Sequence, residues 1–454
     1  MRGHSATAVL KECKYRTLCA VVLIVYCAAR QIAMAQDEPM SREDYSKAKE
    51  MLHNIHDDIR KHYFDKRYQG VDLDARFEAA EKKIETAPSM NYALADIAGA
   101  VSALNDSHTF FIPPPRPYKH SYGWEMQAIG NSDCFVTAVR PSSDAEKKGL
   151  KPGDQVLSVN GYAAIREDMW KIQYVFNILR PQPGLRLVVR SRDGTTRQID
   201  AMASMHATER VKYLDYWTFA QEARDAERLH RTQHVEYGND AIIWKLPNFV
   251  FQTDEAKKML DQIRSRKALI LDLRGNPGGS VDFLAYFLGG MFDHEVKIAD
   301  RVRRNGTKPQ LTKSRGDKTF NGKLVVLVDS ESGSASEIFA RVVQLEKRGM
   351  VVGDISSGKV MESEIYPHSI GRMAITFYSA SITEADLIMG DGKSLEHVGV
   401  VPDVRVIPTV DDLVAGRDPA LAHAAGLVGL KITPEEAGKL FPIQWPDDEP
   451  NRRK

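Results

Sequence analysis

The stretch LVVLVDSESGSASEIFAR, residues 324–341, contains an apolar run, a turn of small residues and a helix-like segment in direct succession. The run up to Val328 predicts a buried strand, and the residues after the turn predict a helix. A serine in such a turn exposes its hydroxyl where the free N–H groups of the first helical turn also point. Ser334 is therefore a candidate nucleophile. The alternative is that Ser334 or Ser336 merely caps the helix, with Glu337 favoured by the helix dipole.

Strands and helices alternate on both sides of this stretch, which predicts an α/β domain over residues 206–410. Neighbouring parallel strands end at the same edge of a sheet, so we expect Lys359, which follows the next strand, to share a crevice with Ser334. A lysine that loses hydration there has a lowered pKa, and its neutral amine can accept the serine proton. The alternative is a lysine in a surface turn.

The first 35 residues have the order of a secretory signal peptide. Basic residues precede the apolar run Leu18 to Ala29, and Ala33-Met-Ala35 follows as a cleavage site. The run has about 12 residues, short of the roughly 20 that span a bilayer. We therefore expect cleavage after Ala35 and a secreted or periplasmic protein with no stable membrane insertion. A retained anchor and a lipid on Cys27 are the alternatives.

The charge and the cysteine content of the mature chain exclude several classes. Removing residues 1–35 takes five basic residues and one acidic residue from totals of 62 and 61, which leaves a net charge of −3. A nucleic-acid or anionic-membrane partner is therefore not implied. Three of the four cysteines lie in the signal peptide, so Cys134 remains alone and an internal disulfide is excluded.

Three further regions flank the α/β domain. Residues 36–115 carry apolar side chains at helical spacing, such as Met51 and Ile55, and predict a helical region that closes before a proline-rich linker. Residues 116–205 contain short β-like runs between turn residues and predict a compact β-rich module. Residues 411–454 predict one or two helices and a frayed tail.

Several motifs in this order resemble those of the carboxyl-terminal processing, or tail-specific, serine proteases. They are LNDSHT at 104–109, GLKPGD at 149–154, VNG at 159–161, DLRGNPGG at 272–279, SASE at 334–337, Lys359 25 positions after Ser334, and VGVVPD at 398–403. The resemblance implies an α/β protease domain with crotonase-like βαβ layers, an N-terminal helical region and an inserted β-rich PDZ-like domain. It also implies an endopeptidase that needs no cofactor and cleaves extracytoplasmic proteins near their C-termini through an acyl-enzyme.

The same resemblance assigns roles to residues. Ser334 is expected to be the nucleophile and Lys359 its general base. The oxyanion hole is expected to combine the amide of Ala335 with one in the Gly278-Gly279 turn. Glycines suit that turn because a backbone amide approaches a substrate carbonyl closely only where no Cβ intervenes.

The PDZ-like module is expected to bind protein or peptide substrates by their free C-termini. The resemblance implies that the loop Tyr122-Gly123-Trp124 holds the terminal carboxylate, and that a strand from Trp124 to Ile129 pairs with the peptide. The alternative is a module that only packs against the protease domain.

Two departures from the family pattern concern the base. Many processing proteases carry a glutamine four residues after the lysine, whereas this chain has Ser363 there, preceded by Glu362, which would keep a nearby amine protonated. His108 lies in a segment that resembles the tricorn-core relatives, in which a histidine is the base. His108 is therefore expected either as an alternative base or as an anchor at the end of its helix.

Other enzyme classes find little support in the sequence. Ser356-Ser-Gly-Lys359 fits the S-x-x-K pattern of penicillin-recognising enzymes, but the S-D-N and K-T-G elements that those enzymes need do not occur. The sequence has no H-E-x-x-H, paired C-x-x-C or P-loop motif, so no metal site is predicted. The strongest rival is a catalytically silent relative that acts as a PDZ-containing peptide-binding or scaffold protein.

Overall fold

The computed structural model describes residues 39–207, 233–250, 253–312, 316–371, 375–443 and 445. The predicted signal peptide, residues 1–35, lies outside these ranges. Within them, no helix combines the length and the apolar character needed to cross a membrane.

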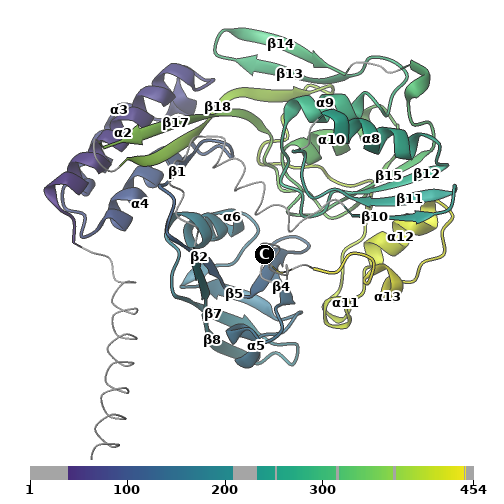
Figure 1. The fold of residues 1–454 in the computed structure, drawn as a ribbon, viewed down its shortest axis with the longest axis horizontal. Coiled ribbons are helices and arrows are strands. Elements are labelled where there is room, and N and C mark those ends of the chain that lie inside the picture. Colours follow the sequence, from purple (N-terminus) through teal and green to yellow (C-terminus); the bar gives the residue numbers. More distant parts are fainter. Residues whose placement is uncertain are drawn as a thin grey trace, which may run out of the picture.

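A six-stranded sheet forms the centre of the α/β region (Figure 1). All of its neighbouring strands are parallel except the first pair. Parallel strands are buried on both faces, which explains the nearly continuous apolar runs of the central strands. In spatial order the strands are β10 (Gln233–Tyr237), β11 (Ala241–Lys245), β12 (Ala268–Asp272), β15 (Lys323–Val328), β16 (Met350–Gly353) and β19 (Val404–Arg405).

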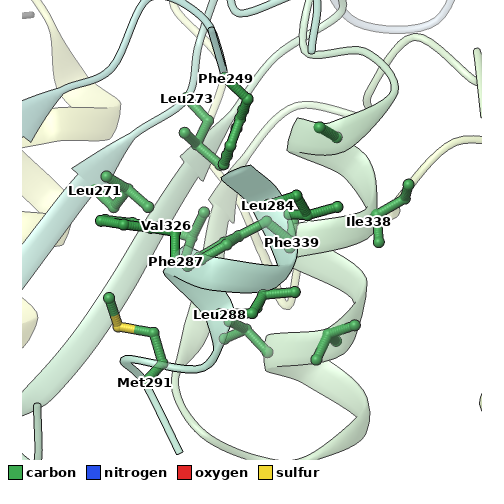
Figure 2. Packing of buried hydrophobic residues seen from close by; sticks show 14 of the residues in the cluster. Phe249, Leu271, Leu273, Leu284, Phe287, Leu288, Met291, Val326, Ile338 and Phe339 are labelled. Atoms are coloured by element: carbon green, nitrogen blue, oxygen red, sulfur yellow. The ribbon is translucent and has the colours of Figure 1, made fainter. Parts of the chain in front are cut away.

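Helices cover both faces of this sheet. Figure 2 shows the core on one face, where the rings of Phe287 and Phe339 lie 5.9 Å apart, close to Leu271 and Val326 of the strands. On the opposite face the C-terminal helices add a second apolar layer. The first face carries α8 (Thr253–Arg264), α9 (Val281–Leu288) and α10 (Ala335–Leu345); α11 (Val410–Ala415) precedes α12 (Pro419–Leu427) and α13 (Pro434–Ala437), which cover the second face.

A second sheet carries the N-terminal helices. Their apolar faces, including Met51 and Ile55, are buried against it. The sheet order is β1 (Phe110–Ile112), β18 (Thr376–Met389), β13 (Lys297–Arg303) and β14 (Gly306–Leu311), with β17 (Met361–Ile370) also paired to β18. The helices are α2 (Arg42–His62), α3 (Leu73–Ile84) and α4 (Met90–Val101), with 3-10 turns at Tyr68–Gly70, Ser102–Leu104 and Gly316–Lys318. Because β1 pairs with β18, the segment just before β1 is held against the rest of the protein.

The β-rich module has its own sheet and its own core. The chain enters and leaves the module through paired strands β2 (Tyr118–Ser121) and β9 (Ser204–Ala207). Cys134 is a free, buried thiol in this core. The sheet order is β3 (Trp124–Ala128), β4 (Cys134–Val139), β5 (Gln155–Val159), β7 (Gly184–Arg190) and β8 (Thr196–Met202), with β6 (Tyr162–Ala163) on β5; α5 (Asp144–Lys147), α6 (Met169–Gln173) and a π-helical turn at Tyr174–Leu179 complete the module.

A buried carboxylate, Asp354, docks this module on the α/β region. It accepts hydrogen bonds from the Gly130 N–H, at 2.9 Å, and from Arg166, at 2.6 Å, both of which belong to the module. It also pairs with Arg405 of β19, at 3.0 Å. One carboxylate therefore joins three segments that lie far apart in the sequence.

Candidate active site

Ser334 lies between β15 and α10, in the strand-to-helix turn that the sequence predicts. Its backbone has φ 51° and ψ −115°, a conformation that is unfavourable for a residue with a side chain. The Ser334 N–H donates to Lys359 O, at 2.9 Å, and to Glu337 Oε2, at 3.0 Å. The turn thus exposes the hydroxyl in a strained geometry, as in the nucleophile elbows of other hydrolases.

The Ser334 hydroxyl faces His108. Nε2 of His108 lies 3.2 Å from Ser334 Oγ, although the two residues are 226 positions apart. Asp106 fixes the loop that carries the histidine, because its Oδ1 accepts the N–H groups of His108, at 3.0 Å, and Thr109, at 2.7 Å. The hydroxyl of Tyr63 donates to the other oxygen of Asp106, at 2.9 Å. The histidine is therefore held next to the serine by a loop whose hydrogen bonds converge on the buried carboxylate of Asp106.

Hydrogen bonds continue from His108 away from the serine. Ser107 Oγ lies 2.8 Å from His108 Nδ1 and donates to Glu396 Oε2, at 2.9 Å. The Ser107 N–H donates to Glu396 Oε1, at 2.7 Å, and the Val360 N–H donates to Oε2, at 2.8 Å. Because the Ser107 hydroxyl proton points to Glu396, its oxygen accepts from Nδ1 and leaves Nε2 of His108 as the acceptor for Ser334.

We did not expect Glu396 at the site from the sequence. It lies two residues before the VGVVPD motif, and that proximity is the only sequence signal that pointed toward it. Its burial raises its pKa, while the hydrogen bonds from Val360 and Ser107 oppose the shift. The contacts order Glu396, Ser107, His108 and Ser334 into a chain of hydrogen-bonded groups, which we call the relay.

Burial keeps His108 uncharged. It lowers the pKa of His108 to about 4; Asp106 raises this pKa, and Lys359 lowers it further. An imidazole that is neutral near pH 7 can accept a proton from a hydroxyl. The protonation state and the hydrogen-bond direction at His108 therefore both suit a general base.

The backbone of Lys359 meets the nucleophile, but its side chain has a different environment from the one expected. Within the described ranges, Lys359 Nζ makes no hydrogen bond to Ser334 Oγ. Burial lowers the pKa of Lys359, whereas the carboxylates of Glu337, Glu331 and Glu396 raise it. The amine thus lies among three acidic groups, each of which favours its charged form.

The two residues that depart from the family pattern bond elsewhere. Glu362 pairs with Arg301 and Arg303 of β13. Ser363 accepts a hydrogen bond from Ser381 of β18, at 3.0 Å. Glu362 is therefore engaged by two guanidinium groups, and Ser363 is engaged by its neighbour across the sheet.

The expected oxyanion donors lie beside the serine. A Cβ on Gly278 would stand 2.6 Å from Ser334 Cβ and 3.0 Å from the Ala335 nitrogen, so only glycine allows this close approach. The Gly278 N–H already donates to Asn276 Oδ1, at 2.9 Å. The N–H groups of Gly279 and Ala335 have no hydrogen-bond partner in the described part of the chain. These two amides are the ones left to bind an oxyanion.

The expected carboxylate-binding loop, Tyr122-Gly123-Trp124, lies at the start of β3 in the β-rich module. The Tyr122 hydroxyl lies 3.0 Å from both the nitrogen and the oxygen of Gln182. Gly123 has φ +70°, and a Cβ there would meet Ser143 Cβ at 2.6 Å. Trp124 begins β3, which lies at the edge of its sheet and pairs only with β4 among the described strands. An edge strand is able to pair with an added peptide.

The far end of β3 touches the turn that leads to the nucleophile. Ser330 Oγ donates to Ala128 O, at 2.6 Å, and Gln127 Nε2 donates to Asp329 Oδ2, also at 2.6 Å. The edge strand β3 and the serine turn are therefore in direct contact.

No group of three or more His, Cys, Asp or Glu side chains among residues with a described structure is arranged to hold a metal ion.

Family models match two parts of the chain. Residues 242–406 match peptidase family S41, and residues 115–173 match the PDZ domain. By this match the chain is similar to peptidase family S41 over its α/β region. It is 25% identical over 338 residues to the tail-specific protease of Haemophilus influenzae and 23% identical over 353 residues to the carboxy-terminal processing protease CtpA of Bacillus subtilis.

These alignments cover 69% and 73% of this chain, but 45% and 69% of the relatives' own lengths. The first relative is thus more than twice as long as the part that aligns. Among solved structures, mature CPAF has a TM-score of 0.60 with 16% identity, and the match covers 82% of this chain and 94% of that chain. This likeness shows that the two chains share a fold.

Proposed function

We propose that this chain is a serine endopeptidase of the S41 type in which Ser334 is the nucleophile and His108 is the general base. The observation that carries the proposal is the 3.2 Å contact between His108 Nε2 and Ser334 Oγ. Ser334 attacks the scissile carbonyl while its proton moves to His108. The amides of Ala335 and Gly279 stabilise the oxyanion.

The relay supplies the rest of the cycle. The protonated His108 passes its proton to the leaving amine, which frees the C-terminal product and leaves an acyl group on Ser334. Water then attacks the acyl-enzyme with His108 again as base, and the serine is restored. Glu396, through Ser107, holds the imidazole in the correct tautomer and favours its transient positive charge.

Lys359 is the alternative base. Its lowered pKa supports that role, but the absence of a bond to Ser334 within the described residues and the three surrounding carboxylates favour His108. We therefore assign the proton transfer to His108 and give Lys359 an electrostatic role beside it.

The substrates are proposed to be unstructured proteins or peptides with free C-termini, cut near that end. The loop Tyr122-Gly123-Trp124 and the edge strand β3 support capture of a terminal carboxylate by the PDZ domain. We propose a secreted or periplasmic location on the basis of residues 1–35. The five region boundaries and the crotonase-like layering of the α/β domain are further parts of the proposal, supported by the alternation of parallel strands and helices.

The test uses the mature chain and an unstructured peptide of about 20 residues, with products identified by mass spectrometry. We expect cleavage by the native protein, none by Ser334→Ala, and weaker cleavage when the peptide carries a C-terminal amide. A catalytically silent peptide-binding or scaffold protein would instead bind the peptide equally well with and without Ser334 and release no product. That outcome would refute the enzymatic proposal.

A further inference from the structure

Glu337 is a fully buried carboxylate in the first turn of α10, three residues after the nucleophile. A glutamate at this position of a helix normally does one thing, which is to accept the N–H of the residue that caps the helix. Glu337 accepts that N–H from Ser334. It also accepts four further hydrogen bonds from a different segment of the chain.

These further donors lie 19 to 22 positions away, in the turn that contains Lys359. Oε1 accepts from Ser356 Oγ at 2.5 Å and from the Gly358 N–H at 2.7 Å; Oε2 accepts from the Lys359 N–H at 2.9 Å, from Ser357 Oγ at 3.3 Å and from the Ser334 N–H at 3.0 Å. The carboxylate therefore ties the serine turn to the lysine turn.

The backbone of Ser334 needs such a restraint. Its positive φ is unfavourable, so the chain would relax to another conformation unless its neighbours held it. The Ser334 N–H is held between Glu337 Oε2 and Lys359 O. Lys359 O is itself kept in place because Glu337 binds the N–H of the same residue. Both acceptors of the Ser334 N–H thus depend on one carboxylate.

The direction of the serine side chain follows from this restraint. With φ fixed, the Cβ of Ser334 points between Gly278 and His108, and the Ala335 N–H stays unbonded in the described structure. If φ relaxed, the hydroxyl would leave the imidazole and the oxyanion amide would turn away together. Reactivity would be lost without any change in the positions of Glu396, Ser107 and His108.

We propose that Glu337 is a positioning residue for the nucleophile, clamping the turn at 356–359 to Ser334 so that the hydroxyl and the Ala335 amide keep their reactive orientation. The inference rests on the proposed function. Burial raises the pKa of Glu337, but the hydrogen bonds oppose that shift, and five donors in contact with two oxygens require a carboxylate that only accepts.

The test is Glu337→Gln. Either orientation of the glutamine amide would direct its NH₂ group at donors, so at least two of the five hydrogen bonds would be lost. The matched control is Glu346→Gln, an exposed glutamate that follows the same helix. A second variant, Ser356→Ala, removes one of the donors and leaves the carboxylate intact.

The readout is covalent labelling of the mature protein by a fluorophosphonate, followed by intact mass. Ser334 Oγ forms a bond to phosphorus, fluoride leaves, and His108 takes the serine proton. The amplitude of labelling gives the fraction of protein molecules that are folded and able to react. The rate constant of labelling measures how reactive Ser334 is in those molecules. A purely structural role would lower the amplitude, but a positioning role lowers the rate constant.

We expect Glu337→Gln to label with a rate constant 30- to 100-fold below that of the native protein. Peptide hydrolysis should lose kcat to a similar extent, with KM within about threefold. Ser356→Ala should label 3- to 10-fold more slowly, and Glu346→Gln at the native rate.

A native rate constant in Glu337→Gln or, if that variant does not fold, in Ser356→Ala would overturn the inference. So would a loss of amplitude at an unchanged rate. If the native protein itself neither labels nor hydrolyses peptide, the proposed function has failed, which is a separate result.

Discussion

Replacement of His108 by alanine removes the only imidazole within hydrogen-bond distance of Ser334 Oγ among the described residues. General-base catalysis by a positioned side chain contributes a factor of about 10² to 10⁴. At about 1.4 kcal/mol for each tenfold change, this corresponds to about 2.7–5.4 kcal/mol of transition-state stabilisation. We expect kcat to fall by that factor in His108→Ala, with little change in KM, because the PDZ domain and the oxyanion amides are untouched.

The pH dependence separates the two candidate bases. The pKa of His108 is lowered to about 4, so at pH 6 only about 1% of the imidazole is protonated. A protonated imidazole cannot accept the serine proton, and activity is therefore lost as the pH falls through this pKa. The native kcat/KM should be flat from pH 8 to about pH 5 and then fall tenfold per unit below about pH 4. A lysine base would lose activity at a much higher pH.

The assay is hydrolysis of a quenched fluorescent, unstructured peptide between pH 3.5 and pH 9. His108→Ala is compared with Lys359→Met and with His294→Ala, whose side chain is 63% exposed. We expect the first variant to be nearly inactive, the second to retain measurable activity, and the third to match the native protein. The assignment of the base would be refuted by near-native activity in His108→Ala together with an inactive Lys359→Met and an acid limb near or above neutral pH.

Three further predictions concern packing and stability. Gly278→Ala would bring a Cβ within 2.6 Å of Ser334 Cβ, so kcat should fall at least 100-fold; native kinetics would contradict the close approach. Burial is the main reason why the pKa of Glu331 is raised from 4.5 to about 8. The ionised carboxylate is therefore less stable in the folded protein than in the unfolded chain, and the free energy of unfolding decreases as the pH rises from about 4.5 to about 8. Glu331→Gln should therefore raise the melting temperature more at pH 8 than at pH 5. The difference corresponds to at least about 1 kcal/mol in the free energy of unfolding. An equal rise in melting temperature at both pH values would contradict this prediction. Asp354→Ala leaves Arg166 without its carboxylate and should lower the free energy of unfolding by about 3 kcal/mol, measured in urea; an unchanged midpoint would contradict it.

Much of the serine side of the site could be predicted from the sequence because it depends on local structure. The apolar run before Asp329, the small residues of the turn and the helix after it determine where Ser334 lies, and β15 and α10 have this order. The rule for neighbouring parallel strands also brought Lys359 to the right place, since its carbonyl oxygen accepts from the Ser334 N–H.

The direction of the Lys359 side chain and the position of Glu396 could not be predicted in the same way. They depend on loops whose paths are determined by packing between distant segments, such as the pairing of β1 with β18 that carries His108 toward the serine. Glu396 has no periodic or spacing signal of its own, because its hydrogen bonds come from Ser107 and Val360, which lie far from it in the sequence. Non-local contacts of this kind are not encoded by any short pattern.

The relay has a consequence for when the protein becomes active. Ser107 and Glu396 are 289 positions apart in the chain, so the proposed catalytic group is complete only after most of the polypeptide has been made and folded. A chain truncated before residue 396, or one whose N-terminal helices have not yet docked, has the nucleophile without a working partner. The proposed nucleophile therefore gains its proton acceptor and the support of Glu396 only when folding has brought the two ends of the described chain together.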